Sequence, residues 1–169
     1  MKKVEGRTAF ITGGASGIGL SMARSFGRAG MNVVLADIDP EALETALADL
    51  HQRQIKAIGV ECDVVSRESM KEAAKKAVAE FGKVHVVCNN AGVGAGGPIE
   101  EVRPSDWDWV IDVNLKGVVI GTEVFAPIMR EQGEGGHFVN TASMAGMVSP
   151  PGMEPYKIGK AWWRGAGMC

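Results

Sequence analysis

The most constraining feature of the sequence is a glycine-rich stretch between an apolar run and a helical pattern. The run Arg7–Thr12 is compatible with a buried strand, and it passes directly into the stretch Gly13–Gly19. Apolar residues then recur at helical spacing as far as Ala29, and Gly30 is typical of a helix end. Glycines in this position allow a tight turn and let an anion approach the free N–H groups at the start of the helix. The sequence therefore predicts strand, turn and helix, with an anion-binding site at the turn.

Strand-like and helix-like segments alternate along the rest of the chain. Further strands are predicted over Asn32–Asp37, Lys56–Glu61, Val84–Cys88 and Gly136–Asn140, and helices over Pro40–Arg53, 67–81 and Pro104–Met129. This alternation favours right-handed β-α-β units and a parallel sheet. The residues that follow such strands meet at one edge of the sheet, where ligands bind. We expect an α/β fold of about five strands in one domain.

The longest predicted helix contains polar and small residues that interrupt its apolar pattern. Its expected inward positions are Trp107, Ile111, Leu115 and Val118. Asn114 and Gly117 lie among them. A buried asparagine in a helix either accompanies a local kink or points its amide into a polar cavity, and the sequence leaves both open.

The second predicted strand ends in a carboxylate, Asp37, which lies 18 residues after Gly19. An acid about 20 residues beyond the glycine motif is expected to bind the ribose hydroxyls of a dinucleotide. A carboxylate there repels a 2′-phosphate, and neither Ser16 nor Ile38 supplies a compensating base, so NAD is favoured over NADP. As an alternative, Asp37 caps a helix, although Asp39 is better placed to do so.

A second chemical signal lies in the segment that begins at Pro155, which is well placed as the first residue of a helix. Tyr156 and Lys160 then share one helical face. An ammonium close to a phenol lowers the phenol pKa from about 10, which yields a proton acceptor for an alcohol near neutral pH. Tyr156 is the only tyrosine in the chain. The pair alone also fits an ordinary amphipathic helix, because this spacing occurs by chance in many helices.

Taken together, these motifs resemble the short-chain dehydrogenase/reductase family of the Rossmann type. The matching pieces are Thr12-Gly13-x-x-x-Gly17-Ile18-Gly19, Asp63-Val64, Asn89-Asn90-Ala91-Gly92, Asn114, Ser143 and Tyr156-x-x-x-Lys160. The resemblance covers roughly residues 4–160. It implies a doubly wound, three-layer αβα Rossmann fold with strand order 3-2-1-4-5. Residues 1–160 then form an incomplete NAD-binding domain, and residues 161–169 a tail outside the family pattern.

The resemblance also implies roles for single residues. The implied cofactor-binding residues are Gly13, Ser16, Gly17, Ile18, Gly19, Asp37, Asp63, Val64, Asn90, Ala91, Gly92, Tyr156 and Lys160. Asp63 then holds the adenine amino group, and Lys160 also grips the nicotinamide ribose. In the implied catalytic set, Asn114 holds a water in a proton relay, Ser143 binds the substrate oxygen and Tyr156 takes the hydroxyl proton. The plainer alternatives are that Ser143 caps a turn and that Asn114 only kinks its helix.

The chain stops nine residues after Lys160, whereas the family continues with two further strands and a loop over the substrate. The last residues lack a helical apolar period and contain two glycines, which we interpret as a truncated or frame-shifted terminus. On this interpretation the fifth strand becomes an exposed edge. The homo-oligomer that is usual in the family is then in doubt.

The composition limits the classes of partner. A net charge of −2, with both signs interspersed, offers no nucleic-acid or membrane surface. No apolar run is long enough to span a membrane and no signal peptide is evident, so we expect a cytoplasmic protein. The three cysteines have no metal-binding spacing, and we predict no metal site.

The sequence thus predicts an oxidoreductase that transfers a hydride between NAD(H) and a secondary alcohol/ketone pair. The alternative, from a different class, is a catalytically inactive remnant that only binds NAD. The substrate is not identifiable, because the residues that line its pocket in the family lie mostly beyond Lys160.

Overall fold

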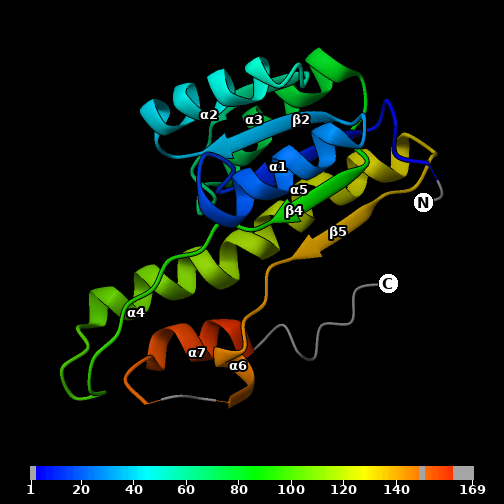
Figure 1. Ribbon diagram of the computed structural model, residues 1–169. Coiled ribbons are helices and arrows are strands. Elements are labelled where there is room, and N and C mark those ends of the chain that lie inside the picture. Colours follow the sequence, from blue (N-terminus) through cyan, green and yellow to red (C-terminus); the bar gives the residue numbers. More distant parts are fainter. Residues whose placement is uncertain (1–2, 149–150, 162–169) are drawn as a thin grey trace.

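Five parallel strands form one sheet at the centre of the molecule, in the order β3-β2-β1-β4-β5 (Figure 1). The strands are β1 (Thr8–Thr12), β2 (Asn32–Asp37), β3 (Ala57–Glu61), β4 (Val86–Asn89) and β5 (His137–Asn140). The computed structural model describes residues 3–148 and 151–161. The predicted strand order and fold class are confirmed, and the predicted strands agree with the observed ones to within two residues at each end.

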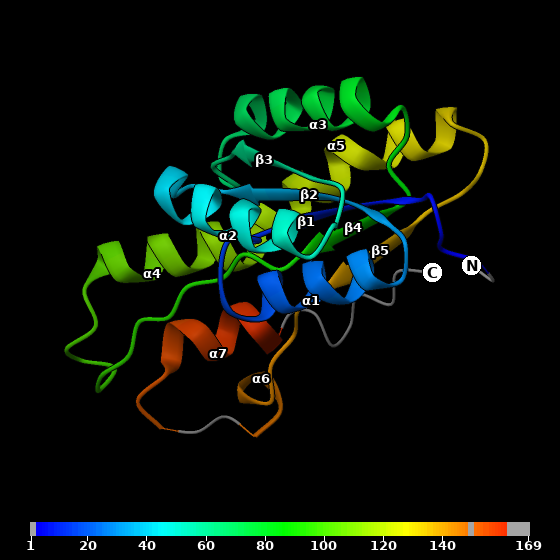
Figure 2. The ribbon, with the colours of Figure 1, turned by 45° about the horizontal axis from the view of Figure 1, so that its top comes forward.

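Helices cover both faces of this sheet (Figure 2). The helices are α1 (Gly17–Arg28), α2 (Pro40–Gln52), α3 (Arg67–Phe81), α4 (Pro104–Ile111), the π-helix η1 (Asp112–Lys116), α5 (Gly117–Glu131), α6 (Ala145–Val148) and α7 (Glu154–Ala161). Side chains of β1 alternate between the two resulting cores. Ala9 and Ile11 pack with α1 and α2, whereas Phe10 packs with α3 and α5. This two-sided burial explains why β1 is a short run without exposed positions.

The long predicted helix is divided by η1, which contains Asn114. The segments follow one another directly, and α4 projects beyond the C-terminal ends of the strands, where it lies beside α7 (Figures 1 and 2). Because the sheet does not extend under α4, the predicted inward positions there were partly wrong. Trp107, Ile111 and Leu115 are only half-buried, whereas Val118 in α5 is buried.

Two smaller differences concern the last part of the described chain. Helix α7 begins at Glu154, one residue before the predicted start at Pro155, and α6 is a short helix that was not among the predicted elements. The domain boundary at residue 160 stays a prediction, and residues 162–169 of the predicted tail lie outside the described residues. Within the described ranges, no helix has both the length and the apolar character needed to cross a membrane.

The packing of the core between the sheet and helices α3 and α5 can be tested directly. Phe125 of α5 is fully buried, and its ring centroid lies 4.5 Å from that of Phe10. Replacing Phe125 with Ala should lower the free energy of unfolding by about 3–5 kcal/mol, because it leaves a cavity against the sheet. Val119→Ala, on the exposed side of the same helix, should change it by less than about 0.5 kcal/mol. Urea unfolding measures both, and equal losses would contradict the assigned packing.

Candidate functional site

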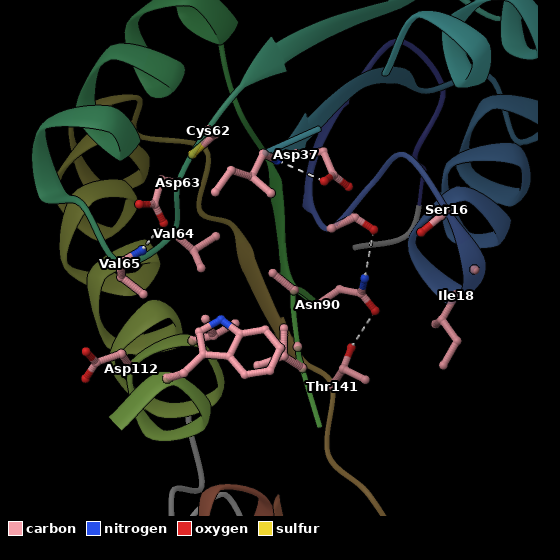
Figure 3. A pocket seen from close by; sticks show the side chains of 18 of the residues that line it. Ser16, Ile18, Asp37, Cys62, Asp63, Val64, Val65, Asn90, Asp112 and Thr141 are labelled. Carbon is pink, nitrogen blue, oxygen red and sulfur yellow. Dashed lines mark hydrogen bonds between the residues drawn. The ribbon is translucent and has the colours of Figure 1, made fainter. Parts of the chain in front are cut away.

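A cavity of about 600 Å³ opens at the C-terminal ends of the strands (Figure 3). The predicted residues that line it are Gly13, Ser16, Gly17, Ile18, Asp37, Asp63, Val64, Asn90, Ala91, Gly92, Tyr156 and Lys160. Its remaining walls come from Ile38, Cys62, Val65, Val93, Trp109, Asp112, Val113 and Thr141. Gly19, Asn114 and Ser143 were also predicted as site residues, but they do not line the cavity. The cavity therefore gathers residues from all five strand ends and from α7.

The glycines are required where the turn between β1 and α1 is tightest. Gly13 has a φ of 61°, in the left-handed region that other residues rarely adopt. A Cβ on Gly19 would lie 2.0 Å from the Gly13 carbonyl oxygen and 2.8 Å from the Asn90 Nδ2 atom. Gly19 thus lies behind the loop and permits close packing, which explains why it is absent from the cavity wall.

The N-terminus of α1 differs from those of the next two helices. Asp39 caps α2 by accepting from the Ala42 N–H, and Ser66 caps α3 by accepting from the Ser69 N–H. By contrast, the Ser16 side chain makes no capping hydrogen bond to α1, and no acidic residue stands in its first turn. First-turn N–H groups without a capping side chain attract an anion. The start of α1 is therefore suited to a phosphate group that enters the cavity.

Asp37 holds the glycine loop in place. Its Oδ2 accepts from the Ala15 N–H at 3.0 Å, and its Oδ1 accepts from the Ile38 N–H at 2.8 Å. The alternative that Asp37 caps the following helix is wrong, because Asp39 occupies the cap position of α2. The carboxylate lies in the cavity wall, where its remaining acceptor capacity can receive ligand hydroxyl groups.

The loop after β3 forms an apolar wall with one acid in it. Asp63 Oδ1 accepts from the Val65 N–H at 3.1 Å, which fixes the turn. Beside it, burial raises the pKa of the Cys62 thiol to about 11, so this cysteine is a packing residue. In the described ranges, no group of three or more histidine, cysteine or acidic residues is arranged to hold a metal ion.

Asn90 joins the ends of β1, β4 and β5. Its Nδ2 donates to the carbonyl oxygens of Thr12 (3.0 Å) and Gly13 (3.2 Å), and its Oδ1 accepts from the Thr141 hydroxyl at 3.1 Å (Figure 3). The Thr12 hydroxyl in turn accepts from the N–H groups of Asn90 and Ala91. These bonds hold the glycine loop at a fixed position relative to the cavity.

Lys160 reaches the same junction from α7. Its Nζ donates to the Thr141 carbonyl oxygen at 2.8 Å and lies 5.8 Å from the centroid of the Tyr156 ring. Only 4% of Lys160 is exposed, and burial lowers the pKa of its ammonium below the ordinary value. Tyr156 and Lys160 thus come from one helix and line the same cavity as the glycine loop.

Asn114 lies just behind this part of the cavity. Its amide exchanges two 2.8 Å hydrogen bonds with the backbone of Val93. A Cβ on Gly92 would meet Asn114 Oδ1 at 3.2 Å and Lys160 Nζ at 3.4 Å, so all three groups are neighbours. Asn114 is a buried residue of the π-helix η1. Its role in a proton relay stays a prediction.

Ser143 follows β5 and lies just before the short helix α6. Its Oγ accepts from the Ala145 N–H at 3.2 Å, which agrees with the alternative that it caps a turn. It does not line the cavity, so its contact with a substrate also stays a prediction.

Sequence reasoning missed several residues of the site, of which Thr141 and Trp109 matter most. Thr141 contributes through its hydroxyl to Asn90 and through its carbonyl to Lys160. Trp109 lines the cavity from α4. Its spacing of four from Val113, which precedes Asn114, was a usable signal, because residues four apart share a helix face.

The family model described as short chain dehydrogenase matches residues 7–166 of this sequence. The chain belongs to the short-chain dehydrogenase family. A curated relative, the C alpha-dehydrogenase of Sphingobium sp. strain SYK-6, is 42% identical over 162 residues. These residues are 95% of this chain and 53% of the relative.

Solved structures of short-chain dehydrogenases have the same fold. One from Burkholderia phymatum, in complex with NAD, has a TM-score of 0.92 at 45% identity, over 95% of this chain and 57% of its own. An NAD⁺-bound xylitol dehydrogenase has a TM-score of 0.90 at 34% identity, over 95% of this chain and 62% of its own. The chain therefore spans between about half and two thirds of the length of these relatives.

The buried ammonium predicts a pH-dependent stability. Because the pKa of Lys160 is lower in the folded chain than its ordinary value of 10.5, the unfolded chain binds the proton more tightly. The buried ammonium therefore lowers the free energy of unfolding at neutral pH. This loss disappears as the pH rises through 10.5, because the amine is then neutral in both states. The stability of Lys160→Met relative to the unmodified chain should therefore be highest near pH 7 and fall towards pH 10.

Urea unfolding between pH 7 and 10 measures this difference. Lys71→Met, on the exposed surface of α3, corrects for the loss of one positive charge. A difference for Lys160→Met that stays constant or grows with pH would contradict the burial of its ammonium.

Proposed function

We propose that the protein is an NAD-dependent oxidoreductase that interconverts a secondary alcohol and a ketone. One observation carries this proposal: Tyr156 and Lys160 line the same cavity as the glycine loop and Asp37. A proton acceptor and a nucleotide site in one cavity are what a hydride-transfer reaction on an alcohol needs. The named relatives are consistent with this class, since xylitol itself carries secondary hydroxyl groups.

The residues of the cavity fit a dinucleotide with an unmodified ribose. The start of α1, which lacks a capping side chain, is suited to the pyrophosphate, and Asp37 to the adenosine ribose hydroxyls. A 2′-phosphate would place negative charge beside the Asp37 carboxylate. NAD is therefore the better cofactor than NADP, and both NAD-bound neighbours agree with this assignment.

The protein's part in the reaction is a proton transfer at Tyr156. NAD supplies the hydride acceptor when it is bound. The Tyr156 oxygen takes the proton of the substrate hydroxyl, and in the reverse direction it returns that proton to the carbonyl oxygen. The Lys160 ammonium favours the phenolate by its charge, and its bond to the Thr141 carbonyl holds it on that side of the cavity. Ser143 and Asn114 are proposed to assist by binding the substrate oxygen and a relay water.

One observation favours the alternative of a nucleotide-binding protein without turnover. Ser143 lies outside the cavity wall, and its Oγ accepts from the Ala145 N–H. In this alternative the glycine loop and Asp37 bind NAD, but no substrate oxygen is held beside Tyr156. NADH fluorescence titration followed by a panel of secondary alcohols with NAD separates the two functions, because only the enzyme reduces NAD.

Tyr156→Phe tests the proposed acid–base group. It removes one oxygen and keeps the ring, so NADH should still bind through the glycine loop and Asp37 while turnover falls by at least about 100-fold. Steady-state rates and NADH titration on the same preparation measure both effects. A variant that keeps full turnover would exclude Tyr156 as the proton acceptor.

Asp37→Asn tests the basis of cofactor choice. Asparagine keeps an acceptor for the Ala15 N–H and removes the charge, so the NADPH/NADH affinity ratio should rise by at least about five-fold. Asp39→Asn loses the same charge at the cap of α2 and serves as the matched control. Equal shifts in both variants would mean that overall charge, and not the Asp37 carboxylate, sets the preference.

A further inference from the structure

Large apolar side chains that remain exposed gather around the cavity. Ile18 and Ile38 are each 65% exposed, Trp109 is 50% exposed and Val65 is 38% exposed, and all four line the cavity. The proposed function gives roles to the glycine loop, the acids and the Tyr156 helix, but none to Trp109. An indole that is half-exposed inside a cavity offers a flat apolar surface to a ligand.

The helix face that carries Trp109 runs along the loop after β3. Val113, four residues later, packs against the core cluster that contains Val64. Gly117, four residues later again, approaches the same loop, because a Cβ on it would lie 2.9 Å from a Val64 methyl group. Trp109 continues this face beyond the strand ends, so it covers the cavity on the side of residues 63–65.

A different face of the same helical segment packs on α7, the helix that carries Tyr156 and Lys160. Asn114 packs on α7, since a Cβ on Gly159 would meet the Asn114 Cβ at 3.3 Å. Val113 comes directly before Asn114, and successive residues lie about 100° apart around a helix. Val113, and Trp109 one turn before it, therefore lie on a different side of the helix from the side that packs on α7. Trp109 thus belongs to the helix face that runs along the Val64 loop.

We propose that Trp109 stacks on the purine ring of the dinucleotide and sets the affinity for that half of the cofactor. This inference rests on the proposed function. Stacking on an aromatic side chain suits a purine because every base presents a flat π-face. The neighbouring carboxylate of Asp112 forms an ion pair with Lys116, which offsets its charge beside the ring. Asp63, which lines the same side of the cavity, is placed to select the exocyclic amine.

Binding of cofactor fragments tests the proposal. Trp109→Ala should weaken NADH and ADP-ribose by about ten-fold each, and Trp109→Phe should keep most of the affinity. Nicotinamide mononucleotide, which lacks the purine, should bind to Trp109→Ala as it does to the unmodified chain. Trp107→Phe, on the same helix but outside the cavity wall, is the matched control and should change none of these affinities. Calorimetric titration with each of the three ligands gives the values.

The outcomes separate this inference from the proposed function. An unmodified chain that binds neither NADH nor ADP-ribose would overturn both. Normal ADP-ribose affinity in Trp109→Ala, or a loss confined to nicotinamide mononucleotide, would overturn the role of Trp109 alone. If Trp109→Ala does not fold, a chain with Trp107, Trp162 and Trp163 changed to Phe leaves Trp109 as the only indole. ADP-ribose should then protect its fluorescence from acrylamide, and unchanged quenching would overturn the proposal.

Discussion

The site depends on one amide, that of Asn90, which connects three neighbouring strand ends. Its hydrogen bonds reach Thr12 and Gly13 on one side and Thr141 on the other. Lys160 binds the same Thr141 through the carbonyl oxygen, so α7 is attached to the junction that fixes the glycine loop. The proposed nucleotide site and the proposed acid–base pair, which come from distant parts of the chain, thereby acquire a fixed relative position. Partly buried bonds of this kind are costly to break, because each leaves a polar group without its partner.

Most of the fold was predictable because its signals are local. Alternating apolar runs and helical patterns gave the strands and helices, and Asp39 and Ser66 mark helix starts by ordinary cap chemistry. Strand order followed from the family resemblance. The cavity members predicted from the glycine motif and from Asp37 lie where parallel strands must end together, so topology alone brings them to one edge.

The remaining features depend on contacts that no local pattern encodes. Thr141 is bonded to a side chain 51 residues away, and nothing in its own neighbourhood marks that partner. Periodicity assigned Trp107 to the interior, but α4 extends past the sheet and leaves it half-buried, whereas Trp109 faces the cavity. The π-helix at Asn114 likewise arises where an amide must bind the backbone of Val93 across the chain.

The two sides of the cavity differ in how firmly the fold supports them. The glycine loop and Asp37 follow β1 and β2, which are buried between helices on both faces. By contrast, Ser143 follows β5, an edge strand in which exposed and half-buried side chains alternate. Local opening costs least where few apolar contacts must be broken. We therefore expect the glycine loop and Asp37 to keep their geometry under conditions that already loosen the segment that carries Ser143.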